Sequence, residues 1–301
     1  MTILESLNWA NEKLKKTNID SPMLDAQVIL ANILKVTKSW LFSHFNDELK
    51  THHEEQFSVA ISRRSKHEPV AYIIETKPFY GRNFFVNASV LIPRPATETM
   101  IEEVLKISDG HDSDKTLICD IGTGSGAIAL TLALETLLPV IATDICPEAL
   151  VIAKKNALSL NVKEVEFREG NLLDPVINLF KSIKSSKDPN VSSVHPFTHL
   201  IICANLPYLS NAQMETLSQD VRFEPPRALQ AGPDGLDAYH NLFRQIARNR
   251  DLLPRHLSVF IEIDPIQKQK AVDLIIHNFP TVEPVAIQDL QGLDRLIFIQ
   301  M

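Results

Sequence analysis

The first third of the chain places apolar residues at helical spacing. Between Ile3 and about Arg64 they recur every three or four positions, so that each run presents one apolar face. Ser21-Pro22 is typical of a helix start, because proline is tolerated in a first turn. Two further helices are expected over residues 39–45 and 53–64. We therefore predict a small N-terminal helical domain over residues 1–75.

The pattern changes to alternation of apolar and polar residues in the next segment. Residues 76–92 (TKPFYGRNFFVNASVLI) are rich in aromatic and β-branched side chains. Turn residues stand at Gly81-Arg82 and at Asn87-Ala88, and this combination predicts a β-hairpin. We expect residues 76–92 to connect the helical domain to a second domain. Pro93-Arg94-Pro95 ends the segment, and a helix is expected to follow over residues 98–107.

Short apolar runs then alternate with helical patterns to the end of the chain. Strands are expected at 116–120, 140–143, 165–168, 200–204, 258–263 and 295–300, and helices at 126–137, 147–160, 242–253 and 268–278. Such alternation indicates an α/β domain with a mostly parallel sheet and helices on both faces. We place this domain at 93–301. A polar loop is expected at 110–114, and residues 178–196, rich in Ser, Lys, Asn and Pro, are interpreted as a flexible surface insertion.

Composition narrows the classes of function. The 301 residues suffice for one large and one small domain, and the formal net charge is −7. An acidic balance argues against a broad nucleic-acid-binding surface and against adhesion to membranes. We interpret Arg63-Arg64 as cations at a helix C-terminus rather than as a nucleic-acid contact. His52-His53 has no third ligand nearby, so no metal site is expected.

The three cysteines, at 119, 146 and 203, show no CxxC spacing and stand in or beside apolar runs. We expect them to be reduced core residues. The N-terminus lacks the order of charged and apolar residues found in signal peptides, and no apolar run has the length of a membrane span. A cytoplasmic protein is therefore expected.

A glycine cluster follows the first expected strand of the α/β domain. Three of the nine glycines, Gly122, Gly124 and Gly126, fall within five positions, interleaved with Thr123 and Ser125. Glycine permits backbone angles and close ligand approach that a side chain would block. The cluster also satisfies the GxGxxG/A pattern of dinucleotide binders, and a structural tight turn is the simpler alternative.

Asp144 ends the second strand of this domain, 18 residues after Gly126. A carboxylate at that place can accept hydrogen bonds from both hydroxyls of a ribose. It can also act as the N-cap of the helix expected near Pro147. Together with the glycines, Asp144 indicates a cofactor that carries a nucleoside, without specifying which.

Asn205-Leu206-Pro207-Tyr208 follows the apolar run 200–204 and indicates the chemistry. A polar residue at the carboxyl end of a central strand stands at the mouth of the ligand crevice. An amide nitrogen is a poor nucleophile because its lone pair is delocalised. Two acceptors aimed at its N–H groups would orient the nitrogen toward a methyl donor and stabilise the positive charge that develops on it.

We assign those two acceptors to the Asn205 side-chain oxygen and the Leu206 backbone carbonyl. Pro207 biases the residue before it toward an extended conformation, and Tyr208 offers a flat face for a planar group. A strand that simply ends in an Asn-Pro turn is the alternative. The pattern thus predicts methyl transfer from S-adenosylmethionine to a planar amide or amino nitrogen.

The chain resembles the release-factor-specific glutamine N5-methyltransferases, the HemK or PrmC family, over nearly its whole length. Besides Asn205–Tyr208, the segments that carry this resemblance are LIPRPATE (91–98), DIGTGSGAIAL (120–130), VRFEPPRAL (221–229), GPDG (232–235), Glu262-Ile263 with Gln267, and DLQGLDR (289–295). Upstream, Leu24-Asp25-Ala26 and Arg63-Arg64 match the family's N-terminal helical domain, which recognises the protein substrate.

The resemblance implies a class I S-adenosylmethionine-dependent methyltransferase fold, Rossmann-like, with a seven-stranded, mostly parallel sheet. It implies that the substrate is the glutamine of the Gly-Gly-Gln motif in class I peptide-chain release factors. Carried over by position, the residues expected to hold the cofactor are Gly122, Thr123, Gly124, Ser125, Gly126, Asp144, Asn171, Leu172 and Asn205. Asn205, Leu206, Pro207 and Tyr208 are expected to bind the glutamine amide. A monomer that binds neither nucleic acid nor membrane is expected.

This sequence departs from the family pattern at several positions. Leu206 stands where the family has proline, and Asn171 with Leu172 replace the usual aspartate and a larger neighbour. The other departures are Glu75, Ala96, His199 and Asp264, in place of glycine, an acidic residue, aspartate and glycine. None of them removes a group that the amide-orienting chemistry needs.

Three other functions remain as alternatives. Asn-Leu-Pro-Tyr is also found in ribosomal RNA adenine dimethyltransferases, so one is an RNA N6-adenine methyltransferase, which would need a basic surface and a flipped base. A second is a catalytically silent partner-binding protein of the same fold, suggested by Leu206 and Ala96. A third is an NAD-dependent oxidoreductase, which would have no use for Asn205–Tyr208.

Overall fold

The computed structural model describes residues 1–108, 115–185 and 197–301 and divides them into two compact units. Unit 1 comprises Met1–Thr76, Val86–Ala88 and Leu217–Glu224, and unit 2 comprises the other described residues. The polar loop expected at 110–114 and residues 186–196 of the expected insertion lie outside the described residues. Among the helices that are described, none is long and apolar enough to cross a membrane.

Unit 1 is a small helical bundle. Its helices are α1 (Ile3–Lys15), α2 (Pro22–Leu34), α3 (Lys38–Ser43), α4 (Thr51–Arg64) and α5 (Val70–Ile73). A capping box starts α1: the Thr2 hydroxyl accepts from the Glu5 N–H at 3.2 Å, and the Glu5 carboxylate accepts from the Thr2 N–H at 2.8 Å. The apolar faces of these helices form one core, as the helical spacing predicts.

A buried arginine ties three segments of unit 1 together. Arg64 is 5% exposed, and its guanidinium donates to Asp25 at 2.7 Å and to Asp220 at 2.8 Å. His67 Nδ1 lies 3.0 Å from the other Asp220 oxygen. Arg63 pairs with Glu68 at 2.6 Å. Both arginines lie at the C-terminus of α4, as predicted. Both form ion pairs with carboxylates, so the structure gives no support to the alternative of a nucleic-acid contact.

Replacing Arg64 should strongly destabilise unit 1. Arg64→Met leaves the Asp25 carboxylate, whose side chain is only 14% exposed, without its cation, which costs about 3 kcal/mol. Arg63→Met is the matched control, because Arg63 is exposed and its ion pair contributes less than about 1 kcal/mol. Both tryptophans, Trp9 and Trp40, lie in unit 1, so urea unfolding followed by tryptophan emission reports on this unit. Equal stability losses in the two variants would contradict the role given to Arg64.

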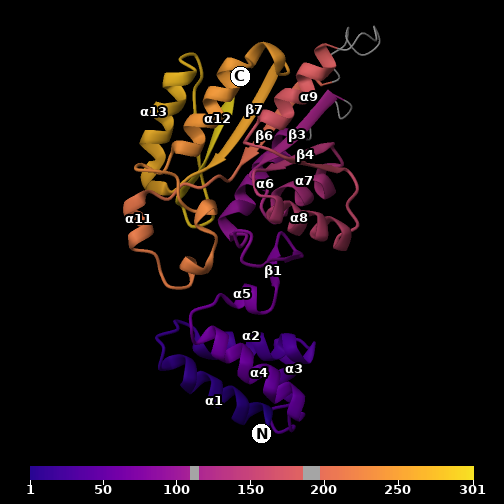
Figure 1. Cartoon of the computed structure of the whole chain (residues 1–301), viewed down its shortest axis with the longest axis vertical. Coiled ribbons are helices and arrows are strands. Elements are labelled where there is room, and N and C mark those ends of the chain that lie inside the picture. Colours follow the sequence, from indigo (N-terminus) through magenta and orange to yellow (C-terminus); the bar gives the residue numbers. More distant parts are fainter. Residues whose placement is uncertain (109–114, 186–196) are drawn as a thin grey trace. The chain divides into compact units, whose positions relative to one another are not determined.

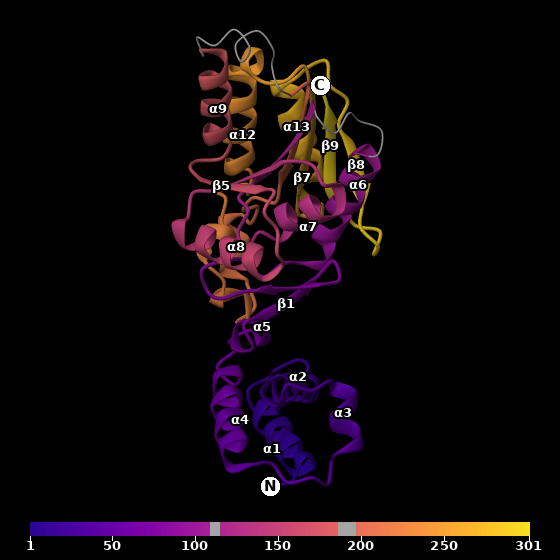
Figure 2. The same ribbon diagram turned by 90° about the vertical axis from the view of Figure 1, so that its right-hand side faces the viewer.

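Unit 2 is built on a seven-stranded sheet with the order β5-β4-β3-β6-β7-β9-β8 (Figures 1 and 2). The strands are β3 (Thr116–Ile121), β4 (Val140–Asp144), β5 (Val165–Glu169), β6 (His199–Ala204), β7 (His256–Glu262), β8 (Val285–Gln288) and β9 (Asp294–Gln300). All pairings are parallel except the two that β9 makes. The prediction of a seven-stranded, mostly parallel sheet is confirmed.

Helices cover both faces of this sheet. They are α6 (Glu98–Ser108), α7 (Ala127–Thr136), α8 (Pro147–Ser159), α9 (Asp174–Lys184), α12 (Asp237–Arg248) and α13 (Lys268–Asn278), with the short α11 (Asn211–Glu215) near the strand ends. Alternate residues of the central strands enter two apolar cores. One core contains residues of α9, α12 and α13, and the other contains residues of α6 and α7. The three cysteines are free and buried, as expected.

The hairpin consists of β1 (Thr76–Phe79) and β2 (Arg82–Phe85), which turn at Tyr80-Gly81. Phe79 and Phe84 are buried in the core that contains α6 and α7. The Asn156 side chain of α8 accepts from the Phe85 N–H at 2.7 Å and donates to its carbonyl at 2.9 Å. Most of the hairpin is thereby an integral part of unit 2.

Two expectations were wrong at the level of single elements, and one strand was not predicted. Residues 178–184, assigned to a flexible insertion, belong to α9, where Phe180 is 1% exposed. The helix expected at 242–253 is α12, which begins five residues earlier because Tyr239 shares its buried face with Leu242. Strand β8 was not predicted, since only four residues form it and none is fully buried.

Candidate active site at the carboxyl edge of the sheet

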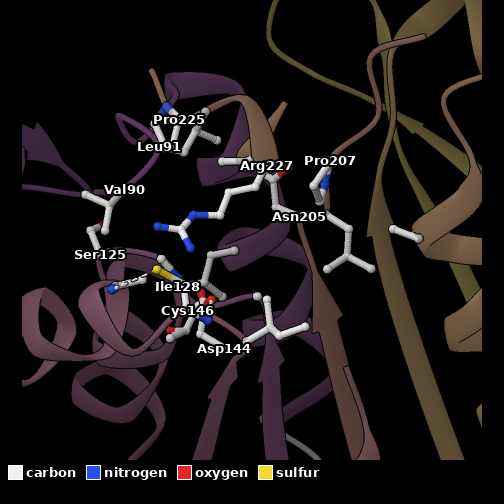
Figure 3. Close-up of a pocket in the computed structure, with 18 of the residues that line it drawn as sticks. Val90, Leu91, Ser125, Ile128, Asp144, Cys146, Asn205, Pro207, Pro225 and Arg227 are labelled. Carbon is white, nitrogen blue, oxygen red and sulfur yellow. Dashed lines mark hydrogen bonds between the residues drawn. The ribbon is translucent and has the colours of Figure 1, made fainter. Parts of the chain in front are cut away.

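The carboxyl ends of four neighbouring parallel strands surround one cavity of unit 2. Its volume is about 300 Å³, at the small end of the range for small-molecule sites. The loops after β3, β4, β5 and β6 contribute the polar part of its wall, and Figure 3 shows Asp144 and Asn205 among the residues around it. The order reversal between β4-β3 and β6 places the cavity at a topological switch point, where open α/β sheets bind ligands.

The glycine loop adopts a conformation that only glycine accommodates easily. Gly122, Gly124 and Gly126 have φ of +74°, +55° and +82°. A Cβ on Gly122 would lie 2.9 Å from Leu206 Cδ2, whereas a Cβ on Gly124 would meet no protein atom within 4 Å. Gly122 therefore packs against Leu206 in the loop after β6, and Gly124 leaves open space for a ligand. Thr123 and Ser125 lie between them and also line the cavity.

Asp120, in strand β3, holds the glycine loop through a hydrogen bond to Thr123, a role that the sequence analysis did not identify. One oxygen of its fully buried carboxyl accepts from the Thr123 hydroxyl at 2.6 Å and from the Ala129 N–H at 3.1 Å. Burial raises the pKa of Asp120 to about 7, against these two hydrogen bonds, which lower it. The sequence did offer an indication of this role, because Asp120 is an acidic residue inside a mostly apolar strand.

Asp144 stands at the end of β4 and faces the cavity. Its carboxylate accepts from the Gly124 N–H and from the Cys146 N–H, each at 2.9 Å. Burial raises its pKa, and those two backbone hydrogen bonds and Arg227 oppose the shift. The N-cap of α8 is Cys146, so the alternative that gave this role to Asp144 was wrong. Each carboxylate oxygen retains acceptor capacity for a ribose hydroxyl.

Asn171 and Leu172 line the cavity from the loop after β5. Leu172 has φ of +51°, and its carbonyl accepts from the Thr143 hydroxyl at 2.9 Å. Gln245 of α12 donates to the Asn171 carbonyl at 3.3 Å and accepts from the Leu173 N–H at 2.8 Å. The loop is thus held in place by its backbone, which leaves both side chains available to define the pocket.

Asn205 extends the buried strand β6 and enters the cavity lining with Leu206 and Pro207. Its Nδ2 donates to the Thr97 hydroxyl at 3.1 Å. Within the described part of the chain its Oδ1 is buried and has no hydrogen-bond partner. A buried acceptor without a partner is costly, so this oxygen is poised for a donor that a ligand would bring.

Tyr239 fixes the backbone around Asn205, and the sequence analysis did not identify it. Its hydroxyl lies 3.3 Å from both the Leu206 nitrogen and the Ala204 carbonyl oxygen, and it also contacts the Glu262 carbonyl oxygen. The ring is fully buried in α12. One hydroxyl thereby couples the ends of β6 and β7.

Tyr208 does not line the cavity that contains Asn205. It lines a neighbouring one of about 410 Å³ together with Arg94, Glu262 and Arg295. Burial raises the pKa of its hydroxyl, with the Glu262 carboxylate as the second cause. The four-residue motif therefore spans two adjacent cavities, with Asn205, Leu206 and Pro207 on one side and Tyr208 on the other.

Two further features of the site come from segments whose role sequence reasoning missed. Arg227 extends into the cavity above Asp144 and Cys146 (Figure 3), and its guanidinium lies 3.6 Å from Glu148. Glu262 is 3% exposed at the end of β7. The sequence could have indicated Glu262, because it stands at the end of a predicted strand, as Asn205 does. No metal-binding cluster of His, Cys, Asp or Glu side chains occurs among the residues that the structure describes.

The cavity fits S-adenosylmethionine. The Asp144 carboxylate can accept hydrogen bonds from ribose hydroxyls, and the space beside Gly124 is open to a ligand. Asn205 Oδ1 adds an acceptor that has no partner among the described residues. Residues 112–216 match the family described as a methyltransferase domain. The catalytic domain of hMettl16, solved with a MAT2A 3'UTR hairpin, superposes with a TM-score of 0.51 at 14% identity, covering 83% of this chain and 81% of that one. Fold and site define a class I S-adenosylmethionine-dependent methyltransferase.

The full-length relatives narrow this class. Residues 5–74 match the family described as the PrmC N-terminal domain. The release factor glutamine methyltransferase of Bacillus cereus is 34% identical, with both chains covered completely. That of Bacillus subtilis is 35% identical over 98% of this chain and 96% of its own length. This chain belongs to the release factor glutamine methyltransferase family.

Proposed function

We propose that this protein transfers the methyl group of S-adenosylmethionine to the side-chain amide nitrogen, N5, of the glutamine in the Gly-Gly-Gln motif of class I peptide-chain release factors. The observation that carries the proposal is Asn205 Oδ1, which is buried beside the cofactor cavity and has no hydrogen-bond partner among the residues that the structure describes. An acceptor with no donor of its own suits a primary amide, which brings two N–H groups. The relatives described above are named release factor glutamine methyltransferases. Because this chain belongs to their family, their names support the same substrate for it.

Residues of the glycine loop and the loops after β4 and β5 would hold the cofactor. In the proposal these are Gly122, Thr123, Gly124, Ser125, Gly126, Asp144, Asn171 and Leu172, together with Asn205. Gly126 starts α7, and the others line the cavity. When bound, S-adenosylmethionine supplies a methyl group on a positively charged sulfur.

Asn205 Oδ1 would accept one N–H of the glutamine amide, and the Leu206 carbonyl would accept the other. These two bonds orient the nitrogen for in-line attack and stabilise the positive charge that grows on it. Pro207 and the Tyr239 hydroxyl keep the Leu206 backbone in place. The N–C bond forms as the C–S bond breaks, and the nitrogen then loses one proton to water. Tyr208 would contact the planar end of the substrate from the neighbouring cavity.

The helical domain, residues 1–75 in the division proposed from the sequence, would recognise the release factor. Trp9, Phe42 and Val59 are exposed on it and offer apolar contact area. In the same division, residues 76–92 would connect the helical domain to the catalytic domain, and residues 93–301 would carry out methyl transfer. Since release factors act on ribosomes, the proposal includes a cytoplasmic location and a monomer that binds its substrate without nucleic acid.

The test is a labelling experiment. The protein is incubated with methyl-labelled S-adenosylmethionine and either an intact release factor or ribosomal RNA, and the label is located by mass spectrometry. We expect one methyl group on the Gly-Gly-Gln glutamine and none on a release factor with alanine at that position. Label on RNA would overturn the proposal, as would no transfer in the presence of bound cofactor.

The same assay tests recognition by the helical domain. A short Gly-Gly-Gln peptide lacks the surface that this domain would contact, so its KM should be far higher than that of the intact release factor. Equal KM values for the peptide and the intact protein would remove the recognition role.

A further inference from the structure

Asn205 and Glu262 end neighbouring parallel strands side by side. In the β6–β7 register Ala204 pairs with Ile261, so the next positions along the two strands are Asn205 and Glu262. Side chains at paired positions of parallel strands project to the same face of a sheet. Cys203 and Phe260, two positions earlier, enter the core that contains α6. Asn205 and Glu262 therefore project toward the side on which Thr97, in the 3₁₀ turn before α6, is placed.

A side-chain amide has two possible orientations, and only one serves the proposed reaction. With Oδ1 toward the substrate, Asn205 can accept an N–H of the glutamine amide. With Nδ2 in that place, donor would face donor and the glutamine nitrogen would be repelled. The two orientations have nearly the same shape, so packing alone selects neither.

The partners of Asn205 select one orientation by hydrogen-bonding type. Nδ2 donates to the Thr97 hydroxyl oxygen at 3.1 Å. Asn205 and Glu262 follow the paired residues Ala204 and Ile261, and interactions with Thr97 and Asn205 lower the pKa of the Glu262 carboxyl. One oxygen of that carboxyl, Oε2, is buried without a hydrogen-bond partner among the described residues and can accept further bonds. An ionised carboxylate accepts only, so it requires the Thr97 hydroxyl proton and an Asn205 N–H to point toward it. Oδ1 is then the atom left over, and it is buried and has no partner within the described residues.

We propose that Glu262 is a positioning residue for methyl transfer: through Thr97 and directly, its carboxylate locks the Asn205 amide with Oδ1 toward the substrate. The inference rests on the proposed function for its catalytic consequence. The orientation itself rests on contacts within this chain alone. Glu262 is 3% exposed and Thr97 is 4% exposed, so water does not compete for these bonds.

The charge of Glu262 makes the lock sensitive to pH. Burial raises its pKa to about 7, and the hydrogen bonds from Thr97 and Asn205 and the cations Arg295 and Arg94 oppose the rise. Tyr208 and Asp289 line a cavity together with Glu262, and the Tyr239 hydroxyl contacts its backbone carbonyl. Burial raises the pKa of both tyrosines, so both stay neutral around pH 7, whereas the hydrogen bond from the Leu293 N–H lowers the pKa of Asp289, which stays ionised. Below about pH 7 the carboxyl gains a proton. A neutral carboxyl can donate to Asn205 Oδ1, so the amide is free to turn.

A spectroscopic experiment tests the lock without any substrate. The side-chain NH₂ signals of Asn205 are assigned in the ¹⁵N–¹H spectrum of the whole protein by their loss in Asn205→Ala. We expect them to shift with pH through a single protonation near pH 7, and not to titrate in Glu262→Gln. A signal that titrates equally in both proteins, or in neither, would overturn the inference.

Kinetics test the catalytic consequence. Glutamine at 262 can donate to Asn205 Oδ1, so Glu262→Gln should lower kcat on the order of tenfold to a hundredfold. The KM for the release factor and the Kd for the cofactor should stay within about threefold of the wild-type values, since neither ligand is bound by Glu262. The acid limb of the kcat–pH profile should disappear in Glu262→Gln. A variant that keeps wild-type kcat, or loses activity through KM alone, would refute the role.

Two control pairs separate positioning from loss of structure. Thr97→Ser keeps the bridging hydroxyl and should keep kcat within about threefold, whereas Thr97→Val removes it and should resemble Glu262→Gln. Ser258→Ala changes another buried polar residue of β7, bonded to His199 at 2.9 Å, and should leave kcat unchanged. Equal losses in Thr97→Ser and Thr97→Val would contradict the hydroxyl bridge. A wild-type protein inactive on release factors would refute the proposed function, while the NMR titration would still decide the orientation of Asn205.

Discussion

Asn205→Ala is expected to reduce methyl transfer by about a thousandfold while leaving the cofactor bound. The variant loses the acceptor that orients the glutamine nitrogen, so both the alignment of the attack and the stabilisation of the developing charge are lost. Asn205 directly follows β6 and packs among Thr97, Leu206 and Glu262, and alanine fits this backbone without strain. Single-turnover rates with the release factor measure the loss, and calorimetric titration with S-adenosylhomocysteine measures cofactor binding.

The control for this prediction is an asparagine with no role in the site. Asn8 is exposed on α1, and Asn8→Ala should retain wild-type turnover. Turnover by Asn205→Ala within tenfold of wild type would show that the amide-orienting role is wrong. A parallel loss of cofactor binding would instead assign Asn205 mainly to the cofactor.

Asp144→Ala should raise the Kd of the cofactor by about a hundredfold. The carboxylate would lose its bonds to two ribose hydroxyls, and the N–H groups of Gly124 and Cys146 would lose their acceptor at 2.9 Å. At saturating cofactor the turnover should fall only a few-fold, because Asp144 lies away from the glutamine amide. Calorimetry with S-adenosylhomocysteine gives the Kd, and kcat is measured at several cofactor concentrations.

Glu148→Ala provides the matched acidic control. Glu148 is exposed near the same cavity, and its ion pair with Arg227 at 3.6 Å is screened by solvent. Its Kd should therefore stay within about fivefold of wild type. If Asp144→Ala binds cofactor as tightly as Glu148→Ala, the ribose contact assigned to Asp144 is not made.

Much of this site was predicted from local patterns. Glycines at 122, 124 and 126 between a strand and a helix indicated a ligand loop, and their positive φ angles are a local property that the sequence encodes. Asp144 and Asn205 stand at strand ends, and parallel strands bring their carboxyl ends to one edge. The structure accordingly places all five of these residues beside one cavity or in the loop that forms its wall.

Other parts were not predicted because they depend on contacts between distant segments. Residues 178–184 precede a polar stretch and alternate polar with apolar side chains, and Phe180 is buried because α9 packs against a core that also contains α12. Arg64 looked like one of two equivalent surface cations, but only Arg64 has Asp25 and Asp220 within reach, 39 and 156 residues away in the chain. Nothing in the local sequence distinguishes it from Arg63.

The sequence by itself determined the order of the elements, the parallel sheet, the glycine loop and the two strand-end residues, because each of these follows from periodicity and backbone preference along the chain. Only the tertiary structure decided how Asn205 is held. Thr97, Tyr239 and Glu262 come from three other elements, and they converge on β6 through sheet register and helix packing. Hydrogen-bond type and burial are properties of that convergence, so the orientation of the Asn205 amide cannot be read from any one segment of the chain.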